Sequence, residues 1–479
     1  VTCATFRLHR APTERAFGAW SFPTTRHGWE AMRAMFQSGL RPAVARVYDP
    51  FDAMLARRGR VQTDDAAPRR TSGWSPGVGA ALLRSVLRRP GAINDLLDST
   101  AAAHALGGAM LVLVFEVTDG AGEDRMDEAR RIARDAGGAW EGPDAARAWF
   151  EHRYAVSYRQ APVFANGAFV DTMEVAAPWS KLEGLFEAVR RALSRRVFVM
   201  AHLSHAYPDG CCIYFSFAGA AHGRRRSDTD WDAACTSTYD LAWRGALAAA
   251  IEAGGTLAHH HGVGRSKAPR LRGELGEAGA DLVRGLMHAF DPKRVLNPGA
   301  LIGAPEEGPV APPPSDDSQA YVLDRQSMLA RAGADLSVAE LDLRLGADGF
   351  TLDATAPEDG PNVGEWLARG APGSRDPWLD PVDHRIAGLD ATLPDGRALR
   401  IPPAPRRSVG PDLTALFVGG GGRFGEIRRA WLRVHPRGAG GGVRRPACTP
   451  LRSERAPPLG EGERRLLDCV ERAIGARGR

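Results

Sequence analysis

The chain has 479 residues, of which 44% are apolar and 25% charged, with a formal net charge of +5. This length allows two or three domains, and no run of about 18 uncharged apolar residues predicts a membrane span. Nearly all cations are arginines scattered among acids, which argues against nucleic-acid binding; the only lysines are Lys181, Lys267 and Lys293. The six cysteines form no C-x-x-C pair, and the first residues alternate like a strand and do not resemble a secretory signal, so we expect reduced thiols in a cytoplasm.

The first predicted unit, residues 1–303, alternates strand and helix signals. Residues 1–8 alternate like a strand, so the chain begins either inside a domain or at an unusual start codon. This order of elements predicts an α+β fold, with a ferredoxin-like antiparallel sheet that carries its helices on one face. The apolar spacing predicts, in chain order, a helix over 27–36, an extended run over 42–48, a buried strand over 110–117, helices over 123–135 and 179–193, strands over 197–203 and 212–217, and a helix over 230–253.

A linker and a second unit follow. Residues 304–317 are rich in proline and acids, which is typical of linkers. The second unit covers residues 318–436, and residues 437–479 form a tail rich in glycine and arginine. The elements predicted here are a helix over 336–345, paired strands around Pro394–Gly396, a strand over 430–434 after a glycine run, and a helix over 462–475.

Three consecutive histidines, His259, His260 and His261, stand between glycines at both ends. In an extended segment side chains alternate, so His259 and His261 would share one side and His260 the other. Two imidazoles on one side could bind a metal or relay protons, and an ordinary pKa of about 6.5 suits proton transfer near neutrality. A hydrogen-bonded core histidine is the alternative, which three in a row between glycines make less favourable.

Three stretches resemble one family. Gly254–Gly264, Lys267–Pro269 and Phe290–Gly299 are similar to the C-terminal domain of FAD-linked oxidases, which are flavoproteins of the vanillyl-alcohol-oxidase type. Within this group, residues 1–303 most resemble alkyldihydroxyacetonephosphate synthase, an ether-lipid enzyme, and its bacterial relatives. The resemblance implies an enzyme whose cofactor is FAD.

Two departures indicate the subgroup. The related 2-hydroxyacid dehydrogenases carry Glu-His-Gly where this chain has His260-His261-Gly262, and the second half of their metal motif is lost in residues 202–215. A tyrosine, Tyr214, stands in that strand instead. The resemblance to the ether-lipid synthase implies that Tyr214 is catalytic. A phenol, with an ordinary pKa of about 10, needs a basic neighbour, which the three histidines would supply. A core tyrosine is the alternative.

Further site positions also come from the resemblance. Ser157–Gln160 is similar to the family's Arg-Asp segment, which implies that Arg159 binds a fatty-acid carboxylate with its planar fork. Gln160 stands where the family has Asp, and a surface arginine is the alternative. Asp171–Trp179 and Arg46–Asp49 are similar to segments that shape the tunnel wall, although the last residue of Arg46–Asp49 could equally cap a turn.

The resemblance also bears on the flavin. FAD needs a glycine-rich loop whose amides approach its pyrophosphate, and the family's loop would precede Val1. Val1–Leu8 resembles the last strand of that flavin domain, and Val409–Ile427 resembles its end, with glycines where the family has Ser-Glu. We therefore expect a partial, degenerate flavin domain over 318–436 and weak or absent FAD binding by this chain. The cofactor contacts implied are Asn297, Gly419 and Gly422.

Three functions remain open. In the first, the protein exchanges an acyl for an alkyl chain through a flavin adduct; Tyr214 and the histidines handle protons, and Arg159 binds the leaving carboxylate. The second is FAD-dependent oxidation of a hydroxy acid or alcohol, which zinc or iron bound by His202, His205 and His259 would favour. The third is a non-catalytic remnant or subunit. We expect no metal, no nucleic acid and a small-molecule or lipid-like substrate; peripheral membrane contact, a homodimer and a flavin-domain partner chain are left open.

Overall fold

A computed structural model describes residues 3–4, 6, 8, 10–58, 87, 90–154, 164, 168–221, 228–303, 310–314, 319–354, 357–373, 385–438 and 460–475. The chain packs as two units: the first is Val1–Met173, Leu193–Tyr207 and Ile213–Ala242, and the second is Glu174–Ala192, Pro208–Cys212 and Trp243–Arg479. The domain boundaries at residues 303 and 317 stay a prediction. Arg159 and most of the predicted linker lie outside the described residues.

A seven-stranded sheet runs through the N-terminal part of the chain. Its strands are β1 (Glu14–Phe22), β2 (Val44–Tyr48), β3 (Ala109–Val117), β4 (Ala139–Gly142), β5 (Phe169–Pro178), β6 (Phe198–Ala206) and β7 (Gly210–Gly219). Their order across the sheet is β4-β1-β3-β2-β6-β7-β5. β3 pairs antiparallel with β1 and β2, and β2 pairs antiparallel with β6. The predicted combination of helices and antiparallel sheet is confirmed, and the ferredoxin-like order stays a prediction.

The helices begin and end at recognisable signals. At the start of α1, the Thr24 side chain accepts a hydrogen bond from the His27 amide, a typical N-cap. After α10, Gly254 takes a φ of +77°, a conformation that favours glycine. This glycine ends the helix, and the histidine segment follows it. The helices described up to residue 303 are α1 (Thr25–Gln37), α2 (Pro50–Arg58), α4 (Pro90–Leu97), α5 (Thr100–Ala105), α6 (Gly122–Asp135), α7 (Asp144–His152), α9 (Trp179–Ser194), α10 (Asp228–Glu252) and α11 (Leu271–Phe290), with a 3-10 turn at Ala268–Arg270.

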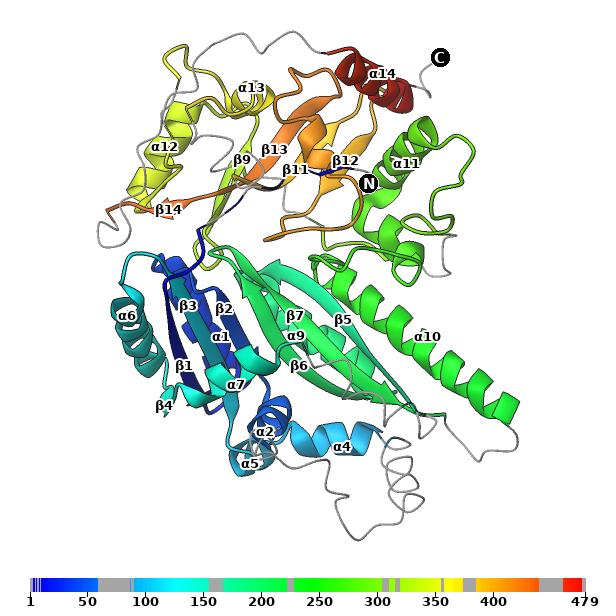
Figure 1. The fold of residues 1–479 in the computed structure, drawn as a ribbon. Coiled ribbons are helices and arrows are strands. Elements are labelled where there is room, and N and C mark those ends of the chain that lie inside the picture. The colour runs from blue at the N-terminus through cyan, green and yellow to red at the C-terminus, as the bar shows by residue number, and fades with distance from the viewer. Residues whose placement is uncertain are drawn as a thin grey trace. The chain divides into compact units, whose positions relative to one another are not determined.

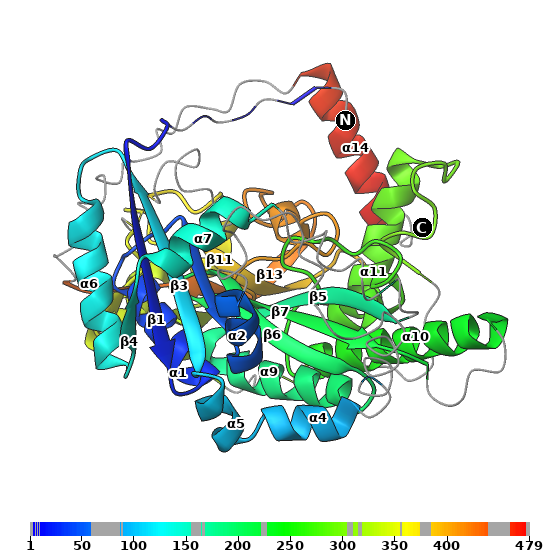
Figure 2. The same cartoon turned by 60° about the horizontal axis from the view of Figure 1, so that its bottom comes forward.

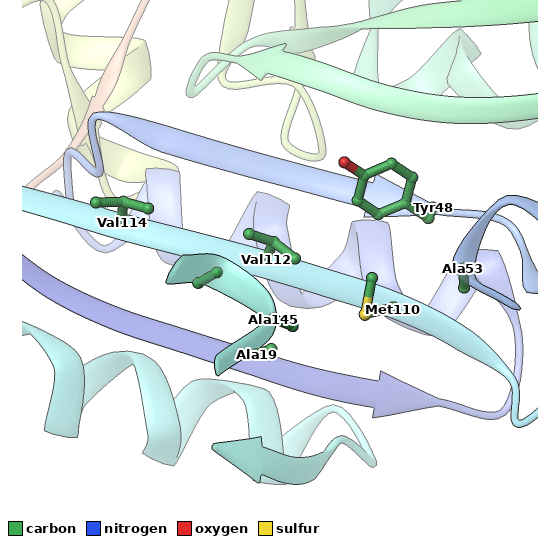
Figure 3. Packing of buried hydrophobic residues seen from close by; sticks show 8 residues of the cluster. Ala19, Tyr48, Ala53, Met110, Val112, Val114 and Ala145 are labelled. Carbon is green, nitrogen blue, oxygen red and sulfur yellow. The ribbon is translucent and has the colours of Figure 1, made fainter. Parts of the chain in front are cut away.

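Helices cover both faces of β1 and β3. β3 is buried at every position from Ala109 to Phe115, so neither of its faces meets solvent. α7 lies on one face of β1 and α6 on the other, where α6 contacts β1 and β4 (Figures 1 and 2). The packing against α6 is close: a β-carbon added to Gly18 of β1 would lie 2.7 Å from the Met126 sulfur of α6. The prediction of helices on one face is wrong, because the central strand is apolar on both sides. The cluster facing α2 and α7 (Figure 3) consists of Ala19, Tyr48, Ala53, Met110, Val112, Val114, Ala145 and Ala146.

The second unit contains a five-stranded antiparallel sheet. Across the sheet the strands are β12 (Ala398–Ile401), β11 (Ile386–Thr392), β13 (Glu426–Arg433), β9 (Leu329–Gly333) and β8 (Tyr321–Asp324). α11 contacts both β12 and α14 (Figure 1). The other elements are β10 (Phe350–Thr351), which pairs with β14 (His435–Pro436), then α12 (Val338–Ala347), α13 (Val363–Ala368), a 3-10 turn at Leu413–Leu416 and α14 (Glu461–Gly475).

Most predicted elements are confirmed to within a few residues, and they are the long or strongly periodic ones, such as α1, β3, α6, α9, α10 and α12. The strand predicted over residues 1–8 is wrong where the structure describes it. Phe6 and Leu8 are 79% and 88% exposed and lie in no strand, because their side chains find nothing to pack against. Within the described part of the chain, no helix combines the length and apolarity needed to span a membrane.

Candidate active site

The histidine segment is fastened to strand β5. Thr256 and Ala176 exchange backbone hydrogen bonds, with the Thr256 amide donating over 2.8 Å and the Ala176 amide over 3.3 Å. Gly255 permits this approach, since a β-carbon there would lie 2.8 Å from the Leu185 side chain and 3.2 Å from the Ala176 carbonyl oxygen. The backbone that leads into the histidines therefore lies directly against β5.

Two residues before Ala176 on β5, a fully buried carboxylate binds the histidine backbone. Glu174 accepts the His259 amide at 2.7 Å on Oε2, the His260 amide at 3.2 Å on Oε1 and the His261 amide at 2.9 Å on Oε1. Successive amides that converge on one anion form a backbone nest. The predicted extended segment is wrong, because in an extended strand successive N–H groups point in opposite directions.

Lys267 supplies the charge that Glu174 needs. Its Nζ lies 3.6 Å from Glu174 Oε1 and donates to the carbonyl oxygens of Leu257, at 2.7 Å, and of Glu174 itself, at 3.1 Å. Burial acts to raise the pKa of Glu174, but the Lys267 charge and the three histidine amides outweigh it and hold that pKa below its ordinary value. Glu174 is therefore ionised at neutral pH.

The nest brings two imidazoles into direct contact. His259 Nδ1 lies 3.0 Å from His260 Nδ1, so one nitrogen donates and the other accepts a single proton. His259 is 2% exposed, whereas His260 reaches solvent. Burial, with the Lys267 and Arg406 charges, lowers the pKa of His260 against the opposing pull of Glu174. The prediction that His259 shares a side with His261 is wrong, since its ring partner is His260.

A second buried carboxylate holds the start of the same segment. Glu274, from α11, accepts the Leu257 amide at 2.8 Å and the Thr256 hydroxyl at 2.7 Å. Arg407 neutralises it, with Nε 2.8 Å from Glu274 Oε1. Two acids from distant elements therefore fix the backbone from Thr256 to His261, and neither was singled out from the sequence.

The ligand atoms of Glu174, Cys212, His259 and His260 lie within 4.8 Å of one another, close enough to surround a metal ion. The expectation that the protein holds no metal stays a prediction. Burial and the Glu174 charge raise the pKa of the Cys212 thiol well above its ordinary value, whereas a metal binds the thiolate. The Lys267 ammonium already neutralises Glu174. The other candidate set, His202, His205 and His259, draws on both units and stays a prediction.

Tyr214 lies in the first unit with His202 and Asp52. The Tyr214 and His202 rings stack, with centroids 4.7 Å apart and planes 14° apart. His202 Nδ1 lies 3.3 Å from Asp52 Oδ2. Burial, with the Arg46 charge, holds the pKa of His202 well below its ordinary value, and burial raises the pKa of Asp52 to about 6 despite Arg46. Tyr214 is thus stacked on a neutral imidazole. Its convergence with the histidine segment, which belongs to the other unit, stays a prediction.

Two predicted wall segments have structural roles. Asp49 is buried and accepts the amides of Asp52 at 2.8 Å and Ala201 at 2.6 Å, so the turn-capping alternative is confirmed. Asp171 accepts the Tyr239 hydroxyl at 2.6 Å. Within the segment Asp171–Trp179, Glu174 organises the histidines. The role of this segment in a tunnel wall stays a prediction.

A flavin pyrophosphate needs free backbone amides at the predicted cofactor contacts. The amides of Gly419, Gly420 and Gly421 donate to the carbonyl oxygens of Leu367, Phe417 and Ala368. These three amides are therefore not free to bind a pyrophosphate. Gly422 takes a φ of +78° in the same turn, and Asn297, at φ +47°, lies on an exposed loop.

Comparison with known proteins identifies the family. The model of FAD linked oxidases, C-terminal domain, matches residues 11–301. Alkyldihydroxyacetonephosphate synthase of Trypanosoma brucei brucei is 23% identical over 312 residues, covering 64% of this chain and 46% of the relative. The synthase of Dictyostelium discoideum is 24% identical over 315 residues, covering 63% and 46%. A solved alkyldihydroxyacetonephosphate synthase structure is 19% identical, with a TM-score of 0.39 over 60% of this chain and 45% of that one.

The chain spans about half the length of the curated relatives it matches. Proteins of this family are enzymes, and their cofactor is FAD. The resemblance stated from the sequence is confirmed, because the family model covers well over half of the 479 residues. This chain belongs to the FAD linked oxidases, through their C-terminal domain.

Proposed function

We propose that this chain carries the acid–base groups of an FAD-linked exchange like that of alkyldihydroxyacetonephosphate synthase. In that reaction a long-chain alcohol replaces the acyl chain of an acylated glycerone phosphate, and a fatty acid leaves. The observation that carries the proposal is the buried Glu174 carboxylate, which holds three histidine amides and so brings His259 Nδ1 to 3.0 Å from His260 Nδ1.

The exchange needs a proton acceptor, because the incoming alcohol must lose its hydroxyl proton before its oxygen bonds to carbon. His260 suits this role, since its lowered pKa keeps its ring neutral near pH 7 and it reaches solvent, while the buried His259 contacts it. The pair takes the proton at one ring nitrogen and passes it to the other. The departing carboxylate or solvent then receives the proton. Because one carbon–oxygen bond breaks and another forms, the exchange involves no net oxidation or reduction.

Tyr214 is the second acid–base group of the proposal. Its role rests on the resemblance of residues 202–215 to the synthase; in the structure its ring stacks on the buried His202, whose pKa is lowered. Arg159 is proposed on resemblance alone as the group that binds the leaving carboxylate, since Arg159 lies outside the described residues.

The described residues offer few groups that could bind the flavin. The amides of Gly419, Gly420 and Gly421 are bound within the protein, so we expect the purified chain to retain FAD at well below one equivalent. The measurement is the visible flavin absorbance per protein after incubation with excess FAD and gel filtration. A stoichiometric yellow protein would contradict this expectation.

The proposed exchange is tested with isotopically labelled long-chain alcohol, an acylated glycerone phosphate and saturating FAD. We expect label to enter the phosphorylated product with one fatty acid released per alcohol incorporated. Dye reduction with a hydroxy acid, without alcohol incorporation, would favour the dehydrogenase reading instead. Exchange that appears only after a flavin-bearing protein is added would favour a subunit.

A further inference from the structure

Three cationic side chains surround one small cavity in the second unit. Lys181 of α9, Arg331 of β9 and Arg400 of β12 line a cavity of about 190 Å³, together with Trp431 and several prolines. Arg331 stands on an inner strand of the sheet, where Trp431 of β13 is its direct cross-strand neighbour. Directly opposed residues share a face of the sheet, so this wall of the cavity is part of the fold itself.

The two guanidinium groups have unused donors. The Nε atoms of Arg331 and Arg400 are buried and have no hydrogen-bond acceptor among the described residues. Arg331 is only 8% exposed, and its Nη2 donates to the Gln319 carbonyl oxygen at 3.2 Å. A buried donor without an acceptor is destabilising, so a native site with two of them is suited to a ligand that supplies oxygens.

The lysine of the cluster is held close to the backbone. A β-carbon on Gly254 would lie 3.0 Å from Lys181 Nζ, so the glycine leaves room for the ammonium. No described residue accepts a hydrogen bond from that ammonium. Burial first, and the Arg400 charge next, lower the pKa of Lys181, while Asp324 opposes them. Lys181 and Arg400 are therefore near enough to repel each other.

The negative charge in the cavity is too small to balance these cations. Among the described residues that line it, Asp324 is the only acid. Asp324 already accepts the Ser180 hydroxyl at 2.5 Å and the Ser327 amide at 3.0 Å. Three cations and one carboxylate leave a formal charge of +2. Asp390, opposite Arg400 on β11, is paired with Arg429 at 3.5 Å.

We propose that this cavity binds the phosphate group of a small phosphate monoester or of free phosphate. A phosphate dianion, present above its second pKa of about 6, matches the excess charge and offers three acceptor oxygens to the unused donors. The cavity is smaller than the roughly 300–1,000 Å³ of sites for drug-sized ligands, so it takes a phosphate with a short substituent. This proposal does not depend on the exchange reaction proposed above.

The test is calorimetric titration of the whole 479-residue chain with inorganic phosphate, with glycerone phosphate and with acetate, at constant ionic strength and without FAD or alcohol. We expect both phosphates to bind and acetate to bind far more weakly. Tighter binding of glycerone phosphate identifies the ligand as a monoester, and equal binding identifies it as free phosphate. Acetate that binds as well as phosphate would overturn the assignment.

Variants locate the site. Lys181→Met and Arg400→Met are each expected to weaken phosphate binding roughly tenfold or more, because each removes a charge-assisted hydrogen bond. Lys293→Met, at an exposed position in the same unit, is the matched control and should leave binding unchanged. Should Arg400→Met fail to fold, Lys181→Met decides alone. Equal phosphate affinity in wild type and Lys181→Met, or no binding by the wild type, would overturn the proposal.

Discussion

Glu174→Gln is expected to abolish the exchange activity and to lower the free energy of unfolding by about 3–5 kcal/mol. The substitution keeps the size of the side chain but removes its charge. Lys267 would then be buried without a counter-ion, and three amides would face a group that itself carries two donors. The measurements are chemical denaturation and labelled-alcohol incorporation.

Two further variants separate the charge pair from general damage. Glu187→Gln, on the exposed side of α9, should stay within about 0.5 kcal/mol of wild type. The double variant Glu174→Gln/Lys267→Met should be less destabilised than the sum of its two single changes, because neither charge is then left unpaired. Strictly additive effects would show that the pair does not act as a unit.

The same carboxylate should make stability depend on pH in one direction. The folded pKa of Glu174 lies below its ordinary value of 4.5, so its contribution is fully present above that pH. The contribution is lost as the pH falls through the folded pKa. The stability difference between wild type and Glu174→Gln should therefore be constant at neutral pH and shrink in acid; a difference that grows in acid would contradict an ionised Glu174.

Tyr214→Phe is expected to lower the exchange rate by about 10²–10⁴-fold while the protein stays folded. The phenyl ring keeps the stacking on His202, so only the hydroxyl is lost. The effect should fall on kcat rather than KM, since the hydroxyl is proposed to move a proton. Tyr321→Phe is the control: it removes a hydrogen bond to Asp348 in the second unit and should leave the rate unchanged. Full activity in Tyr214→Phe would remove Tyr214 from the mechanism.

Local patterns were enough to predict most elements that pack through their own periodicity. The apolar run of β3 and the long α10 with its terminal glycine are examples. The coverage of β3 on both faces was missed, because an apolar strand does not reveal what lies on each side of it. The strand predicted over residues 1–8 failed for the converse reason, since alternation without a pairing partner leaves Phe6 and Leu8 exposed.

The site was predicted in part. The sequence singled out the histidines, but their conformation depends on Glu174, which lies 85 residues before His259. No local rule connects the two. A signal was present nevertheless: Glu174 is an acid within the apolar stretch from Met173 to Ala177, and Lys267 is one of three lysines in a chain whose other cations are arginines. A lone charge in an apolar strand is either costly or paired, and here it is paired.

Hydrogen exchange at the amides of His259, His260 and His261 tests the central claim most directly, because it needs neither flavin nor substrate. These amides lie in no helix or strand, yet each donates to the buried Glu174 carboxylate. The predicted result is slow exchange in wild type and in Glu187→Gln, with protection lost in Glu174→Ala. Rapid exchange in the wild type, or protection that survives in Glu174→Ala, would contradict the account.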